Sequence, residues 1–476
     1  MTRIALAVAL ALLPALVAAQ TVDDLRPDRD AAAALDAPAA DAVLQHYLDQ
    51  ALRANPALAA RDADVRASDA DLAATRAQQY PQLSLNARYT HADGGRTIDL
   101  PVGDLLNPVY DTLNRMLEQQ GQPAPFPQID NQQIDFLRSH EQETKLSLSA
   151  PLIAPQLWAS IDAKRALAGA SRAGREAYAR VLVRELKRTY YGAIEAAAAV
   201  GILEASEKLL AENVRVSQAL VDAGKATRDR VLRAEAEHLD ASQQLDAARA
   251  RAAQARRLLN LLRAEPDDAP LALPTPDALR MPARRQTPAQ TRPELRQIDA
   301  NARAAQAAAR AARNAALPTL GVAADYGIQG TDYRFDDEHD FDTVSLVLSW
   351  KLWDAGRRRA EQAQATAQRD SLRRQRTDLQ RRLELARRGA EDDLATALRA
   401  IDTGGARVAA AEEAFRIAER KRDLASLSQI EFLDAERSLR EAKLKLAIAR
   451  CDALDRAAEL ELASASYDLP DNLTAP

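Results

Sequence analysis

Aromatic residues, glycine and cysteine are scarce in this chain. Only 4% of its 476 residues are aromatic, 16 are glycine, and Cys451 is the one cysteine. A single cysteine excludes a disulfide within the chain, and its place in a helical pattern suits a small residue at a helix interface. With a charged fraction of 28%, the composition favours long helices that pack through small residues.

Long apolar runs are also missing. Residues 4–17 provide about 14 apolar positions, whereas a helical membrane span needs about 20. A basic residue precedes this run and small residues follow it, so residues 1–19 are predicted to be a secretory signal peptide. The nearest later run, 190–203, is interrupted by Glu195. If such a chain enters a membrane, it must do so as a β-barrel.

The patterns of enzyme active sites and metal centres are absent from the sequence. The five histidines are scattered without metal-ligand spacing, and no phosphate-binding loop, nucleophile motif or zinc pattern occurs. A net charge of −5 argues against nucleic acid as the main partner. We therefore expect no catalytic residues, no metal and no cofactor.

What the chain does contain is an internal repeat. An alanine-rich run opens at Asn55-Pro56 and closes at Tyr80-Pro81, and the same arrangement returns between Pro293 and Pro318 at a constant offset of 237 residues. Later landmarks recur at an offset of 200 or 201, so the first copy carries about 37 extra residues between its alternating segments. A shared offset over this distance indicates duplication.

The repeat divides the chain into six parts. Its middle part is rich in proline, which predicts a stiff, extended connector. The parts are the signal peptide (1–19), a loosely ordered segment (20–40), the first repeat (41–264), the proline-rich connector (265–292), the second repeat (293–466) and a C-terminal tail (467–476).

Each repeat contains two segments in which apolar and polar residues alternate, near 82–91 and 142–152, and near 319–329 and 341–351. Segments of about ten residues with one apolar face are typical of transmembrane barrel strands. A half-buried soluble sheet is the alternative, although four strands could cover no core of their own. Four strands also cannot enclose a channel, so a barrel must be shared, with eight strands from two chains or twelve from three.

Very long helices are predicted to follow the strands, at about 155–222 and 354–424. Apolar residues recur along them and along the return helices with alternating spacings of three and four, the pattern of a coiled-coil seam. The fold class is therefore mainly α with a membrane β-barrel, built on a duplicated helix–strand–strand–helix protomer.

Two tryptophans and three arginines stand where the last strand meets its helix. Indole rings favour headgroup depth and guanidinium groups bind lipid phosphates, so these residues suit a membrane interface. Ordinary polarity at a helix start is the alternative. The residues are Trp350, Trp353, Arg357, Arg358 and Arg359.

Glu431 and Asp434 are the main candidate functional residues. They share one helix face and each precedes a seam residue, so neither points into the seam. In a symmetric oligomer they would form two stacked acidic rings, which attract cations and can gate a pore. A surface salt bridge between Asp434 and Arg437 is the alternative.

In the order of its elements, the chain resembles the TolC-type outer-membrane efflux protein family. Asn55-Pro56, Tyr80-Pro81-Gln82-Leu83 and the segment from Ser428 to Leu439 (SQIEFLDAERSL) carry the resemblance, which covers nearly the whole mature chain. It implies a homotrimer whose twelve-stranded barrel continues into a coiled-coil tunnel from the outer membrane into the periplasm. The partners it implies are a periplasmic adaptor (membrane fusion) protein and an inner-membrane pump.

The resemblance also assigns roles at the helix tips. It places the pore constriction at Glu431 and Asp434, and helix-tip or adaptor contacts at Gly224, Thr227, Ala425 and Ser428. Ala425 and Leu427 replace the glycine and the basic residue usual in the family, so the latch that closes the tip differs here.

The implied function is a passive exit duct of a tripartite efflux or type I secretion system. A periplasmic coiled-coil structural or adaptor protein without a pore is the alternative.

Overall fold

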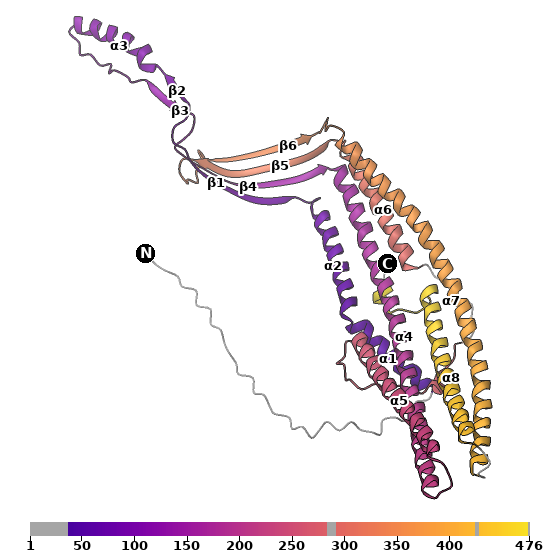
Figure 1. The fold of residues 1–476 in the computed structure, drawn as a ribbon. Coiled ribbons are helices and arrows are strands. Elements are labelled where there is room, and N and C mark those ends of the chain that lie inside the picture. Colours follow the sequence, from indigo (N-terminus) through magenta and orange to yellow (C-terminus); the bar gives the residue numbers. More distant parts are fainter. Residues whose placement is uncertain (1–36, 283–291, 424–427, 475–476) are drawn as a thin grey trace. The chain divides into compact units, whose positions relative to one another are not determined.

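The computed structural model describes residues 37–282, 292–423 and 428–474, and in these the chain is mainly helical with a small sheet (Figure 1). The predicted signal peptide, Ala425 and Leu427 lie outside the described residues. Two compact units are present, each made of three chain segments. The helical unit comprises the described parts of 1–53, 185–284 and 394–458, and the sheet unit those of 54–184, 285–393 and 459–476.

The main sheet has four antiparallel strands in the order β1-β4-β5-β6. Most of its side chains are exposed, including Leu85 (71%) and Leu346 (71%), so within one chain the sheet covers no core. In the described residues β1 and β6 are the edge strands. The strands are β1 (Gln82–His91), β4 (His140–Ile153), β5 (Thr319–Gly330) and β6 (Asp340–Ser349).

A hairpin with its own helix lies between β1 and β4. It consists of β2 (Thr97–Leu100), α3 (Val102–Gln119) and β3 (Gln132–Asp135), with β2 and β3 paired. The sequence predicted four strands and about 37 extra residues in this region, and it predicted neither the strands β2 and β3 nor the helix α3. Pro101 stands at the N-cap of α3 and Pro108 inside it. Both prolines weaken the helix signal although neither prevents the helix.

The helices of the sheet unit pack through small and apolar residues. Asn55 begins α2 by accepting hydrogen bonds at Oδ1 from the backbone of Ala57 and Leu58. Leu72 of α2 then packs on Ile161 of α4. The helices are α2 (Pro56–Ala77), α6 (Pro293–Asn314), α9 (Asp471–Thr474), the first parts of α4 (Pro155–Asp222) and α7 (Arg357–Asp423), and the end of α8 (Gln429–Ser464).

The helical unit contains α1 (Ala37–Ala54), α5 (Arg228–Arg263) and the remaining parts of α4, α7 and α8. Its core includes Leu210, Ala241 and Phe432, all at most 1% exposed. Phe432 is therefore buried, as its place in the predicted seam requires. Among the described helices, none combines the length and the apolar composition needed to cross a membrane.

The described part of the connector, up to residue 282, packs on helices instead of standing free. The Tyr47 hydroxyl of α1 accepts a hydrogen bond of 2.9 Å from Ala272 N. Arg450 of α8 pairs with Asp277 at 3.0 Å and donates to Pro276 O, beside the short 3₁₀ helix Pro276–Ala278. Because proline carbonyls remain good acceptors, a proline-rich segment can be tied down by side-chain donors.

Candidate functional site

Glu431 and Asp434 lie in the first turns of α8, and both side chains are exposed. Glu431 forms a capping box with Ser428. Its carboxylate accepts from Ser428 N at 3.3 Å, and the Ser428 hydroxyl accepts from Glu431 N at 3.3 Å. Ser428 and Glu431 are thus fixed by the start of the helix, while Asp434 projects from the next turn.

The predicted alternative, a bridge from Asp434 to Arg437, does not occur among the described residues. Arg437 instead forms an ion pair with Glu237 of α5. Asp434 therefore keeps an exposed carboxylate on the same helix face as Glu431, while Phe432 and Leu433, which lie between them in the sequence, are buried. Two acidic side chains in this position can attract cations electrostatically.

Beneath this exposed pair lies a buried polar cluster that the sequence did not reveal. Glu436 and Arg440 are 4% and 5% exposed, and their closest charged atoms are 3.8 Å apart. Ser206 of α4 donates to Glu436 and accepts from Arg440 at 3.2 Å. The sequence signal for this cluster is the spacing of Glu436 and Arg440, which are oppositely charged and four positions apart on one helix. The cluster joins α8 to α4 near the tip.

The turn between α4 and α5 has the hydrogen bonds of a Schellman motif. Lys225 N donates to Leu220 O and Gly224 N to Val221 O, both at 2.9 Å. Gly224 has φ = 69°, and no atom lies within 4 Å of where its Cβ would be. Backbone conformation, not space, therefore requires glycine. Thr227 caps α5 in extended conformation, and its hydroxyl contacts Asp229.

The predicted membrane-interface residues come together between β6 and α7. Trp350 and Trp353 are 57% and 81% exposed, although the Trp350 indole donates to Ala316 O at 3.0 Å. Arg357 pairs with Glu361 at 3.2 Å and Arg358 with Asp354 at 2.7 Å. The side chain of Arg359 is exposed.

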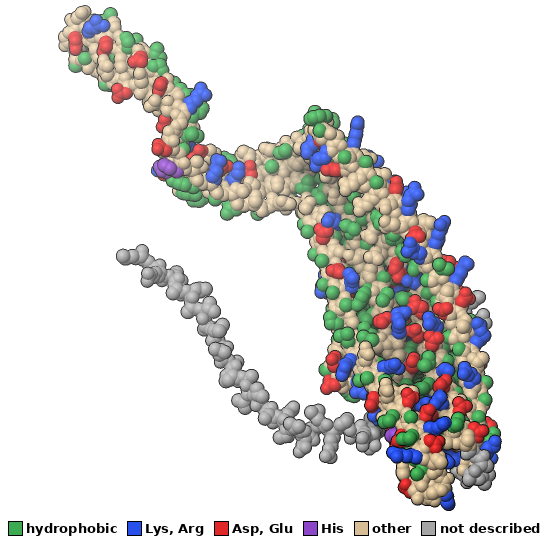
Figure 2. Space-filling view, in the orientation of Figure 1, with side chains coloured by type: hydrophobic (Ala, Val, Ile, Leu, Met, Phe, Trp, Pro, Cys, Tyr) green, Lys and Arg blue, Asp and Glu red, His purple; other side chains and the backbone are tan. Residues whose placement is uncertain are grey.

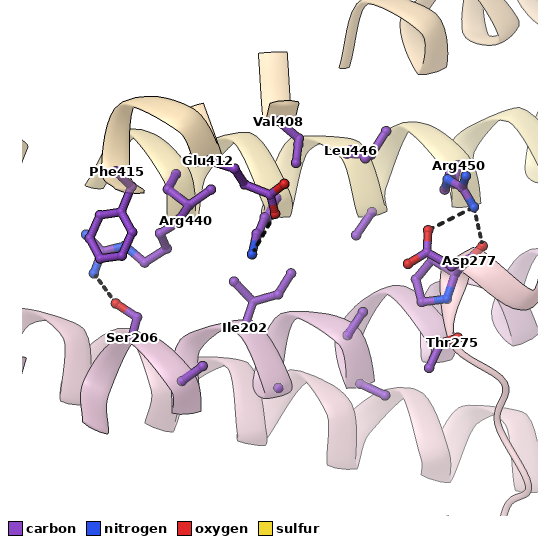
Figure 3. A pocket seen from close by; sticks show the side chains of 18 of the residues that line it. Ile202, Ser206, Thr275, Asp277, Val408, Glu412, Phe415, Arg440, Leu446 and Arg450 are labelled. Atoms are coloured by element: carbon purple, nitrogen blue, oxygen red, sulfur yellow. Dashed lines mark hydrogen bonds and ion pairs between the residues drawn. The ribbon is translucent and has the colours of Figure 1, made fainter. Parts of the chain in front are cut away.

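A cavity of about 740 Å³ opens in the helical unit between α4, the connector, α7 and α8 (Figure 3). Ile202, Val408 and Leu446 form apolar walls, and the Arg450–Asp277 and Ser206–Arg440 contacts lie at its two ends. Over the described residues, no three histidine, cysteine or acidic side chains gather as metal ligands. The cavity thus has aliphatic walls and polar side-chain contacts at both ends.

Comparison with solved structures shows the same fold in several proteins. The chain is 20% identical to the open state of the Neisseria gonorrhoeae MtrE outer membrane channel, with a TM-score of 0.72, covering 88% of each chain. For the Campylobacter jejuni CmeC outer membrane channel, identity is 14%, TM-score 0.73 and coverage 90% of this chain and 88% of that one. For VceC of Vibrio cholerae, an outer membrane protein, the values are 16%, 0.71, 89% and 96%.

Comparison by sequence gives a family and no individual relative. No curated protein matches the chain. The model of the outer membrane efflux protein family matches residues 47–264 and 286–466, which are most of both repeats. The predicted resemblance is thereby confirmed, and the chain belongs to the outer membrane efflux protein family.

Proposed function

We propose that this protein is a passive, homotrimeric outer-membrane duct of a tripartite efflux or type I secretion system. The observation that carries the proposal is the family match across both repeats, together with a four-stranded sheet whose apolar side chains are exposed. A sheet of this kind needs a cover that one chain does not provide. Lipid outside and neighbouring protomers on each side would supply it.

The two edge strands support closure between protomers. In the described sheet, β1 and β6 each pair with one neighbour only, and exposed edges offer unpaired backbone groups to another chain. Pairing β6 of one copy with β1 of the next would close twelve strands from three copies. Trp350 and Trp353 would then lie at headgroup depth, with Arg357, Arg358 and Arg359 near lipid phosphates.

The tips of the helical unit would form the periplasmic entrance of the duct. Glu431 and Asp434, repeated in each protomer, give two acidic rings that favour cations and constrict the entrance. The α4–α5 turn at Gly224 and Thr227, with Ala425 and Ser428 of the second tip, provides the contact for a periplasmic adaptor. The inner-membrane pump supplies the energy, so the duct itself needs no catalytic residue and no cofactor.

This architecture implies a protein exported by its N-terminal signal peptide (1–19) and spanning from the outer membrane into the periplasm. The domain division proposed from the sequence follows the same scheme, with the first repeat at 41–264 and the second at 293–466. Each repeat would contribute one strand pair to the barrel and one helix pair to the tunnel.

The deciding experiment is ion conductance of the purified mature protein in planar lipid bilayers. Glu431→Gln/Asp434→Asn removes both charges while Gln can still accept the Ser428 N–H bond. We expect discrete, cation-selective openings that lose selectivity in this variant. Glu235→Ala/Asp240→Ala, two exposed acidic residues of α5, is the control and should leave selectivity unchanged.

Two other outcomes separate the parts of the proposal. If cation selectivity is unchanged by the double substitution, the protein is still a channel, but Glu431 and Asp434 do not form its constriction. Folded protein that stays soluble without detergent and conducts nothing would favour the alternative, a periplasmic coiled-coil adaptor or structural protein.

A further inference from the structure

Helix α3 of the β2–α3–β3 hairpin presents an apolar stripe whose side chains are partly exposed. Val109 and Met116 are 52% and 56% exposed, and Leu106 and Leu113 are 37% and 39% exposed. The stripe follows spacings of four, three, four and three, which is the seam of a coiled coil. Its members are Val102, Leu106, Val109, Leu113 and Met116.

Polar side chains on another side of α3 form their hydrogen bonds within the hairpin. Asn107 exchanges two hydrogen bonds of 2.8 Å with the backbone of Ile129, and Asn114 makes the same pair with Phe126 at 2.8 and 3.2 Å. At Gly103, an added Cβ would lie 2.2 Å from Ile129 O, so the helix and the returning chain are in close contact. The hairpin is thus held together without the apolar stripe.

The paired strands at the base of the hairpin are also apolar on the outside. Ile98 and Ile134 face each other across the ladder and are 41% and 49% exposed, while Phe136 is 59% exposed. Hydrophobic side chains are visible at the surface of the hairpin in Figure 2. Contiguous exposed apolar surface of this kind marks an interaction site.

The charges of α3 distinguish between a lipid and a protein partner. Asp104, Asp111 and Glu118 recur every seven residues, and Arg115 is the one basic residue of the helix. Helices that lie on membranes carry lysine and arginine on their polar face, since lipid surfaces are anionic. In the heptad that places the stripe at the a and d positions, the three acidic residues take position f, the farthest from the seam. The pattern therefore fits helix association.

We propose that the α3 helices of the three protomers pack together through this stripe and form a helical cap at the outer mouth of the duct. The inference rests on the proposed trimer, in which each protomer contributes one identical stripe. The cap would restrict the outer mouth of the duct, in addition to the constriction proposed at Glu431 and Asp434.

Because each hairpin is attached to the sheet of its protomer, a short coiled-coil seam is sufficient for the α3 helices to associate. A helix of 18 residues gains most of its stability from packing and little from propensity alone. Each hairpin, however, is rooted in the sheet, where Ala92 N donates to Ser139 O at 3.1 Å and the His91 and His140 rings lie 4.8 Å apart. Linked copies meet at effective concentrations in the millimolar range, which compensates for a seam of few turns.

Oxidative cross-linking of cysteine variants in isolated outer membranes tests the cap. Leu113→Cys places a thiol in the seam, and Glu118→Cys places one on the opposite, acidic edge of the same helix. We expect copper–phenanthroline to convert most Leu113→Cys monomer to disulfide-linked dimer, because one cysteine per protomer joins two of three copies. Glu118→Cys should remain monomeric, and buried Cys451 should react in neither.

Equal cross-linking of both variants, or none of Leu113→Cys, would overturn the cap. Leu106→Cys and Asp111→Cys form a second matched pair, so a folding defect in one variant does not decide the result. Conductance of the same proteins separates the two proposals. Normal openings without cross-linking in the seam would support the proposed duct and contradict the cap. Cross-linking in the seam without openings would support association of the α3 helices and contradict the duct.

Discussion

The return helices α5 and α8 have the same length, 36 residues, and begin 201 residues apart, yet they bury different side chains. In α8, Glu436 and Arg440 are buried against Ser206. The matching positions of α5, Glu235 and Leu239, are exposed. Duplication has therefore preserved the helix while the partners of its side chains have diverged.

The two return helices also contribute side chains of different size to the core at the tip. Phe432 of α8 is 1% exposed and packs with Leu210 and Phe415, and the Arg422 guanidinium lies 4.4 Å from the centre of its ring. Its counterpart in α5 is Val231, also buried but smaller. Substitutions at matched positions can measure how far the two helices have diverged.

The largest contrast is expected between Glu436→Ala and Glu235→Ala. Removing Glu436 leaves the buried Arg440 without its carboxylate and should lower the free energy of unfolding by about 3–5 kcal/mol. Removing the exposed Glu235 should change it by less than about 0.5 kcal/mol. Urea unfolding of detergent-solubilised protein, followed by circular dichroism, measures both. Equal losses would mean that α5 and α8 are equivalent in the assembly.

A smaller contrast is expected between Phe432→Ala and Val231→Ala. The first removes an aromatic ring from the core and should cost about 3–5 kcal/mol. The second removes two methyl groups and should cost about 1–3 kcal/mol. Thermal denaturation of both variants provides the test, and a larger loss at Val231 would place the more tightly packed core in the first repeat.

The smallest expected effect is a pH-dependent change in stability that arises from Glu195 of α4. Burial, aided by the negative charge of Asp452, raises the pKa of Glu195 above its ordinary value of 4.5. The charged form is thus disfavoured in the folded state, and the penalty grows as pH rises from 4.5 through the folded-state pKa. Glu195→Gln should therefore stabilise the protein at neutral pH and lose this advantage at acidic pH. Melting temperatures measured across that pH range provide the test. An increase from Glu195→Gln that is the same at acidic and neutral pH would contradict the prediction.

Local signals predicted the main elements of the fold. Alternation of apolar and polar residues coincides with the four strands of the main sheet, and the alanine-rich run that opens at Pro56 coincides with α2. Helix α3 is harder to predict because Pro108 lies inside it, and proline in a helix interior removes a backbone hydrogen bond. The apolar spacing from Val102 to Met116 is the local signal that indicates it.

Contacts between distant segments were harder to predict. The sequence identified Glu431 and Asp434 as a pair on one helix face, but the choice of Glu237 as the partner of Arg437 depends on α5. The buried cluster of Glu436 and Arg440 needs Ser206, which lies 230 residues from Glu436. Packing of the connector on Tyr47 likewise depends on tertiary structure, which composition alone does not reveal.

The pairing of β4 with β5 has a consequence for biogenesis. Leu148 lies opposite Ala324 in this ladder, so the two repeats join in the sheet although α4, α5, the connector and α6 lie between the two strands in the sequence. Contacts this distant in sequence are slow to form. Until the second strand pair has folded against it, β4 keeps one edge unpaired. The arrival of β5 thus sets the pace at which the sheet is completed.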